Sequence, residues 1–158
     1  MYRFRQGELQ VLLVHPGGPL WGRKDAAAWF VPKGEINPGE EEFAAAKREF
    51  TEETGVTPEG SFIELGQITQ KSGKKVTAWA FEGDCDSSCI KSNTFEMEWP
   101  PRSGKRASFP EVDRAEFFSY EAAQEKMIPA EFEFFTRLQR TLRESETAKH
   151  PHPQKSAS

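Results

Sequence analysis

Three features are scarce in this sequence: long hydrophobic runs, cysteines and an excess of positive charge. No apolar stretch reaches about 18 residues, so we expect no membrane-spanning helix, and the N-terminal residues lack the apolar core of a signal peptide. The two cysteines, Cys85 and Cys89, have no second pair to complete a zinc site. We interpret them as incidental thiols of a protein in the reducing cytoplasm. The formal net charge of -4 gives no electrostatic footprint for nucleic acid.

What the sequence does contain is a large set of aromatic residues in a polar chain. Of its 158 residues 36% are hydrophobic, yet 13 are Phe and 4 are Trp. We therefore expect one domain over residues 1–144, with a core that depends on aromatic side chains. After Glu144 the composition turns to Ser, Lys, His and Pro, which predicts a disordered tail over residues 145–158.

The clearest local signals lie between Gly34 and Val56. A turn cluster at residues 37–39 precedes a run of glutamates and alanines that favours a helix. Gly55 suits the left-handed cap that ends many helices. The predicted apolar stripe of this helix consists of Phe43, Ala46 and Phe50.

The same helix carries a concentration of negative charge. Glu49, Glu52 and Glu53 are three and four residues apart, so a helix places their carboxylates on one face. Like charges this close cost roughly 0.2–0.5 kcal/mol per neighbouring pair. That cost makes sense if a hard cation such as Mg²⁺ binds there, because it prefers oxygen ligands. The alternative interpretation is an acidic helix face that is merely solvated.

The complete pattern of this segment resembles the Nudix box. The matching residues are Gly34, Glu40, Arg48, Glu49, Phe50, Glu52, Glu53, Gly55 and Val56. A chance match of this kind is on the order of 10⁻⁸ per starting position. Residues 29–34 also resemble the strand and loop that lead into the box. Residues 15–19 and 93–101 are similar to a bacterial subgroup of predicted nucleotide pyrophosphohydrolases, so the resemblance covers most of residues 1–140.

This resemblance implies an α/β fold, an α/β/α sandwich with a mixed, curved sheet between the box helix and a C-terminal helix. It also implies a hydrolase that cleaves a phosphoanhydride bond in a nucleotide derivative with Mg²⁺ or Mn²⁺. Carried over to this chain, the metal ligands are Glu49, Glu52, Glu53 and the backbone carbonyl of Gly34. Arg48 would orient Glu49. A carboxylate would accept the proton of the attacking water, with Glu49 or Glu53 as near candidates and Glu111 as a remote one.

Glu111 is also the candidate for a fourth metal-binding carboxylate, because Nudix enzymes often draw one from the segment before a late strand. Its position alone supports this assignment. Glu96 and Glu98 compete for the same role.

Substrate contacts are predicted from cations near aromatic or box residues. Trp21 lies close to Arg23 and Lys24 in a loop rich in Gly and Pro, an arrangement that suits base stacking and phosphate contact. The alternative is that Trp21 only packs over its loop. Lys33 adjoins the box and is expected to contact phosphate. Arg102 opens a basic run over residues 102–106, but such runs are usually just solvated, so its role depends on reaching the cleft.

Hydrophobic patterns predict strands at residues 2–4, 9–14, 29–31, 62–70, 76–81, 95–99 and 114–118. Ser119 is the predicted N-cap of a helix that Ile128-Pro129 interrupts. A second helix is predicted over residues 130–143. Its buried stripe would consist of Phe132, Phe135, Leu138 and Leu142.

The cationic loops favour a substrate with several phosphates, such as a dinucleoside polyphosphate or a nucleoside triphosphate. One alternative is the 5′-triphosphate end of an RNA. A second is a non-catalytic nucleotide-binding module on the same fold, against which the three box glutamates argue. We expect a small-molecule nucleotide as the partner and no membrane.

Overall fold

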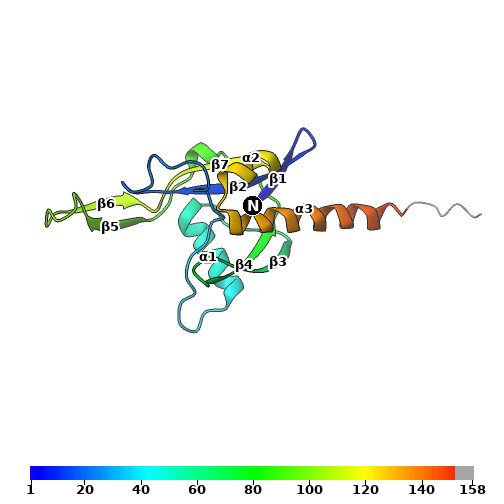
Figure 1. Cartoon of the computed structure of the whole chain (residues 1–158). Coiled ribbons are helices and arrows are strands. Elements are labelled where there is room, and N and C mark those ends of the chain that lie inside the picture. Colours follow the sequence, from blue (N-terminus) through cyan, green and yellow to red (C-terminus); the bar gives the residue numbers. More distant parts are fainter. Residues whose placement is uncertain (152–158) are drawn as a thin grey trace, which may run out of the picture.

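The computed structural model describes residues 1–151. Figure 1 shows a layered body from which a two-stranded hairpin projects on one side and the last helix on the other. The strands are β1 (Tyr2–Arg5), β2 (Glu8–Pro16), β3 (Phe62–Thr69), β4 (Lys75–Phe81), β5 (Thr94–Glu98), β6 (Arg106–Pro110) and β7 (Val112–Ser119). The helices are α1 (Glu42–Thr54), α2 (Tyr120–Lys126) and α3 (Pro129–Lys149), with a 3-10 turn at Ser87–Cys89.

β2 is the centre of the fold, paired antiparallel with β1 on one side and β7 on the other. Side chains alternate along a strand, so Leu12 and Val14 point to one face and Leu13 to the other. Leu12 and Val14 belong to the core cluster that contains Phe50 of α1. Leu13 belongs to the cluster that contains Phe134 of α3. Helices therefore cover both faces of the sheet, which confirms the α/β/α layering.

The strands form three ladders, β1-β2-β7, β3-β4 and β5-β6, and each ladder is antiparallel. Within the described residues, parallel pairing is limited to isolated bridges, one of which joins Tyr2 of β1 to Glu82 just after β4. The mixed character of the sheet is therefore weak. Arg137 of α3 ties the β3-β4 ladder to the body by donating to the carbonyls of Leu65 and Gln67.

The prediction of a strand over residues 29–31 is wrong, because this segment forms only isolated bridges. The Val31 N–H donates to a carboxylate oxygen of Glu131 at 3.2 Å instead of to a neighbouring strand. Pro32 follows directly and has no N–H with which to extend a ladder.

Residues 100–105 of the basic segment form the turn of a hairpin rather than a free loop. Arg106 already belongs to β6, a strand that the sequence pattern did not predict. The pattern missed β6 because the strand carries only two apolar side chains before its terminal proline, Ala107 and Phe109. Both are half-buried against β5.

The predicted break at Ile128-Pro129 is confirmed, because α2 ends at Lys126 and Pro129 begins α3. Proline suits this position, since its fixed φ fits the first helical turn and its missing N–H would have no partner there. The prediction of a disordered tail is wrong for residues 145–149, which are helical because α3 continues to Lys149. Ser145 and Thr147 donate their hydroxyls to carbonyls four residues earlier. The predicted tail over residues 152–158 lies outside the described residues.

Cys85 and Cys89 are both free thiols. In the part of the chain that the structure describes, no helix has the combination of length and apolar character needed to cross a membrane. The cytoplasmic location stays a prediction.

Candidate active site

The box helix α1 begins after a tight turn and ends at Gly55. The Asn37 carbonyl accepts the Glu40 N–H at 3.0 Å, which closes the turn before the helix. Gly55 has φ +74°, and its N–H donates to the Thr51 carbonyl at 2.7 Å. This left-handed cap is the one that a glycine forms most readily, so the predicted helix end is confirmed.

The buried face of α1 differs in part from the predicted stripe. Phe50 is buried, but Ala45 is buried in place of Ala46, which is only partly covered. Ala46 and Phe43 instead line a cavity beside the helix. Glu53 lies on the buried side as well, with 7% of its surface exposed. The box glutamates are therefore not one solvated acidic face, because one of them points into the body.

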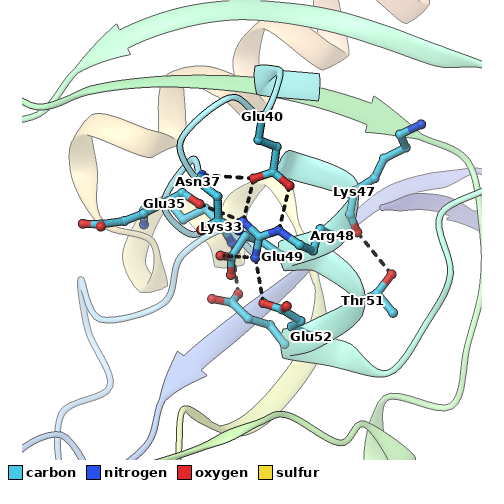
Figure 2. Close-up of polar contacts among 10 residues, drawn as sticks. Lys33, Glu35, Asn37, Glu40, Lys47, Arg48, Glu49, Thr51 and Glu52 are labelled. Carbon is cyan, nitrogen blue, oxygen red and sulfur yellow. Dashed lines mark hydrogen bonds and ion pairs between the residues drawn. The ribbon is translucent and has the colours of Figure 1, made fainter. Parts of the chain in front are cut away.

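Arg48 is the centre of the polar network in this region, as Figure 2 shows. Its guanidinium donates to both carboxylate oxygens of Glu40, at 2.9 Å each. One Nη donates to Glu49 at 2.8 Å and to Glu52 at 3.0 Å, and the other donates to the Glu35 carbonyl. The hydrogen bonds from Arg48 hold the pKa of the Glu40 carboxyl at about 2. Arg48 therefore fixes the loop before α1 and orients two of the three box glutamates.

Glu53 has the most perturbed carboxyl group of the site. Burial raises its pKa to about 8, and the negative charges of Glu49 and Glu111 act in the same direction. The Lys33 backbone N–H donates to Glu53 Oε2 at 3.0 Å, and this hydrogen bond lowers the pKa but does not offset burial. The negative charge at this point is therefore poorly compensated by the protein.

Gly34 lies directly against the Glu49 carboxylate. A Cβ atom added at Gly34 would fall 1.9 Å from Cδ of Glu49 and 2.4 Å from its Oε1. Real Cβ atoms essentially never come closer than 3.0 Å to another atom. The absence of a side chain at Gly34 is what allows the Glu49 carboxylate to occupy this position.

The structure brings Glu111 to the box glutamates. Its N–H donates to the Asn93 carbonyl at 2.9 Å, and the Asn93 N–H donates to the Glu52 carbonyl at 3.0 Å. Partial burial raises the pKa of the Glu111 carboxyl, and the charges of Glu49 and Glu52 raise it further. Its two competitors lie on the projecting hairpin, where Glu96 pairs with Arg106 and Glu98 accepts the Gly104 N–H.

Lys33, which the sequence predicted to contact phosphate, pairs with a buried carboxylate of the protein itself. Its ammonium pairs with Glu131 at 3.0 Å and lies 4.4 Å from the centre of the Phe30 ring. Glu131 is fully buried, and its other oxygen accepts the Val31 N–H. Glu131 thus positions the segment that delivers the Lys33 N–H to Glu53. The sequence did carry a signal for it: a glutamate in the first turn of a Phe-rich helix, on the side that faces the core.

The other predicted substrate contacts are not brought to the glutamates by any contact in the described residues. Trp21 is 41% exposed, and the Lys24 ammonium lies 4.6 Å from the centre of its ring. Arg23 is also exposed. The Lys24 carbonyl is hydrogen-bonded to buried His15, which attaches this loop to the end of β2. Arg102 lies in the β5-β6 turn, at the outer end of the hairpin and away from α1 (Figure 1).

A cavity of about 650 Å³ adjoins Glu53. Its walls are mostly apolar and come from α1, from the β3-β4 ladder, including Trp79, and from the segment that contains Gly34. Three lysines that the sequence reading did not single out also line it: Lys47, Lys74 and Lys75. No pattern along the chain marks them, because they meet only through the packing of β4 against α1.

The donor set suits a hard divalent cation, since all its candidate ligands are carboxylate or carbonyl oxygens. The raised pKa of Glu53 reflects uncompensated negative charge that such a cation would neutralise. Within residues 1–151, no three acidic, His or Cys side chains are already gathered closely enough to hold a metal ion. Glu49 and Glu52 are instead turned toward Arg48. Ligation by these residues remains a prediction that the donor chemistry fits.

Comparisons with known proteins agree with this geometry. The NUDIX domain description matches residues 1–138. An RNA pyrophosphohydrolase of Caulobacter vibrioides is 46% identical over 52 residues, which is 30% of this chain and 30% of that protein. The chain thus matches less than a third of the length of this curated relative.

Two solved structures share the fold. A C. elegans Ap4A hydrolase, solved as a binary complex, has a TM-score of 0.64 and 21% identity, with 90% of this chain and 94% of that chain covered. The NUDIX domain of Shewanella oneidensis NrtR, solved with ADP ribose, has a TM-score of 0.58 and 16% identity, with coverages of 89% and 82%. At these identities the likeness shows the fold alone.

Proposed function

The chain belongs to the Nudix family, and on that premise we propose that it hydrolyses a phosphoanhydride bond in a nucleotide derivative, with Mg²⁺ or Mn²⁺ as the cofactor. The observation that carries this proposal is the proximity of the Glu49, Glu53 and Glu111 carboxylates. Glu49 lies against Gly34, and Glu53 accepts the N–H of the preceding residue, Lys33. Burial raises the pKa of Glu53 and of Glu111, and the charge of Glu49 raises both pKa values further. A cluster of this kind costs stability unless a cation or a reaction makes use of it.

The residues of the box would bind and orient the cation. Glu49, Glu52 and Glu53 would hold the cation together with the Gly34 carbonyl. Arg48 keeps Glu49 and Glu52 on the same side of α1 through its shared Nη group. When bound, the cation supplies charge neutralisation and Lewis acidity to the phosphates.

We assign the role of proton acceptor to Glu111. Within the described residues, the carboxylates of Glu49, Glu52 and Glu53 each accept a hydrogen bond, whereas the Glu111 carboxylate accepts none. It is therefore free to take the proton of the attacking water. Glu111→Gln should lower kcat by roughly 10²–10⁴-fold with little change in KM, and an unchanged kcat would return the role to Glu49 or Glu53.

The cavity beside Glu53 supports a nucleotide-sized substrate, because ligand pockets commonly have volumes of about 300–1,000 Å³ and this one has about 650 Å³. A dinucleoside polyphosphate or a nucleoside triphosphate is our first candidate, and the fold of the C. elegans Ap4A hydrolase accords with it. The 5′-triphosphate end of an RNA is the second, and the Caulobacter vibrioides relative favours it.

The test is a panel of phosphoanhydrides that includes nucleoside triphosphates, dinucleoside polyphosphates, diphosphate sugars and 5′-triphosphorylated RNA. Each is incubated with the protein and Mg²⁺, Mn²⁺ or EDTA, and the products are identified by mass. We expect cleavage only with metal, and its loss in Glu53→Gln. Glu133→Gln is the matched control, because Glu133 is an exposed glutamate of α3 whose one ion pair within residues 1–151 is with Arg137. Equal cleavage with EDTA, or no cleavage of any compound, would contradict the proposal.

A further inference from the structure

The hairpin of β5 and β6 has one apolar face and one charged face. Phe95 pairs with Phe109, and Met97 pairs with Ala107, so their side chains share a face because side chains alternate along each strand. Trp99 continues the same alternation just beyond β5. The apolar face therefore consists of Phe95, Met97, Trp99, Ala107 and Phe109.

This apolar face is separate from the body of the protein. All five side chains are half-buried, and none belongs to either core cluster. Figure 1 shows the hairpin projecting beyond the layered body. An isolated two-stranded hairpin is at best marginally stable in water, so a row of half-buried aromatic residues outside both core clusters is expected to serve a purpose.

The hairpin starts at the rim of the candidate active site. Asn93 precedes β5 and donates its N–H to the carbonyl of Glu52, and Glu111 follows β6. The apolar face begins beside the loop that carries Trp21, because a Cβ added at Gly18 would fall 2.9 Å from the Phe95 ring. A ligand that extends out of the glutamate cluster on this side would meet the aromatic face.

The outer end of the hairpin is cationic. Arg106 pairs with Glu96 at 3.5 Å, whereas Arg102 and Lys105 make no ion pair within residues 1–151 and are exposed. Aromatic rings that accept bases, followed by cations that accept phosphates, are how proteins bind single-stranded nucleotides without strong sequence preference.

We propose that the β5-β6 hairpin binds a nucleobase that lies beyond the phosphate chain, as seen from the glutamate cluster. The base would stack on the apolar face, between Phe95 and Trp99. This inference rests on the proposed function and adds to it a second base-binding element. Two substrates provide such a base: the second nucleoside of a dinucleoside polyphosphate, and the nucleotides that follow the 5′-polyphosphate of an RNA. The first places one base beyond the phosphates, near Phe95. The second also supplies bases that extend along the hairpin to Trp99.

The test compares substrates that share a phosphate chain and differ in the far base. One pair is adenosine tetraphosphate and diadenosine tetraphosphate, and the other is GTP and a short RNA with a 5′-terminal pppG. Phe95→Leu and Trp99→Leu keep an apolar side chain and remove the ring. Phe4→Leu is the matched control, because Phe4 is a 48% exposed aromatic residue on β1.

We expect Phe95→Leu to lower kcat/KM for the base-bearing member of a pair by at least about fivefold, the lower range for the loss of one base–aromatic stack. Adenosine tetraphosphate and GTP should be unaffected, and Phe4→Leu should change nothing. A loss with Trp99→Leu for the RNA alone identifies RNA as the source of the base. Equal effects on both members of each pair, or no effect, would overturn the proposal.

A binding titration separates this proposal from the hydrolase assignment. Tryptophan fluorescence with EDTA should show tighter binding of diadenosine tetraphosphate than of adenosine tetraphosphate, and Phe95→Leu should remove the difference even if no compound is cleaved. Equal binding of the two compounds would refute the role of the hairpin, whether or not the protein cleaves either of them. If a second copy of the chain covers this face, the wild type sediments as a dimer that Met97→Asp dissociates, and that result also refutes it.

Discussion

Gly34→Ala is the most informative single substitution, because it displaces one carboxylate and leaves the acidic residues in place. The new Cβ would lie 1.9 Å from Cδ of Glu49 and must be at least 3.0 Å away, so the carboxylate has to retreat by at least about 1.1 Å. The obstacle is the end of a side chain and not backbone, so rotation of Glu49 relieves it.

The expected costs to stability and to activity differ widely. A shifted Glu49 rotamer costs roughly 0.5–1.5 kcal/mol, and the partly exposed contact with Arg48 adds about 0.2–1 kcal/mol if it is lost. The fold should therefore survive with a Tm lower by a few degrees. A misplacement of about 1 Å in a catalytic group can reduce the rate by roughly 10²-fold, so we expect a loss of that size in kcat/KM and weaker binding of Mg²⁺.

The assay measures metal-dependent turnover of the best substrate from the panel, with Tm from thermal unfolding. Gly22→Ala is the control, because a Cβ at Gly22 meets nothing within 4 Å. In a Glu49→Ala background, Gly34→Ala should cost little further activity, since the obstructed carboxylate is gone. Wild-type turnover and Mg²⁺ affinity in Gly34→Ala, or a full additional loss in the Glu49→Ala background, would refute the reasoning.

Three further predictions follow from the same site. Glu53→Gln should keep the fold, raise Tm slightly without metal because burial and like charges disfavour its carboxylate, and lose activity by orders of magnitude; retained turnover at saturating metal would contradict its assignment. Glu131→Ala removes the fully buried partner of Lys33 and Val31. It should lower the free energy of unfolding by about 1–3 kcal/mol in urea titrations, and an unchanged midpoint would show that the contact is dispensable. Replacing Arg102, Lys105 and Arg106 together with Gln should lower kcat/KM for a 5′-triphosphorylated RNA, whose phosphates beyond the first base would reach the outer end of the hairpin, and should spare a diphosphate sugar. An equal loss for both substrates would contradict a substrate contact by these cations.

The candidate site could be predicted from the sequence to the extent that it is local. The helix, its glycine cap and the spacing of Glu49 and Glu52 lie within one segment, and a helix converts such spacing directly into a shared face. The Nudix resemblance came from the same segment, because the box specifies residue types at fixed intervals. The apolar run of Leu12, Leu13 and Val14 within the predicted strand over residues 9–14 is likewise typical of a strand that is buried on both faces.

Only the tertiary structure decided which groups are buried and which meet across the chain. Glu53 lies on the buried side because Phe50 and Ala45 direct that side of α1 toward the sheet. Glu131 is 98 residues from Lys33 and meets it only through the docking of α3. The position of Glu111 at the glutamates, and the projection of the β5-β6 hairpin from their rim, depend on how β7 pairs with β2. Sequence patterns report the periodicity within one element, whereas burial and electrostatic coupling arise from packing between elements that are distant along the chain.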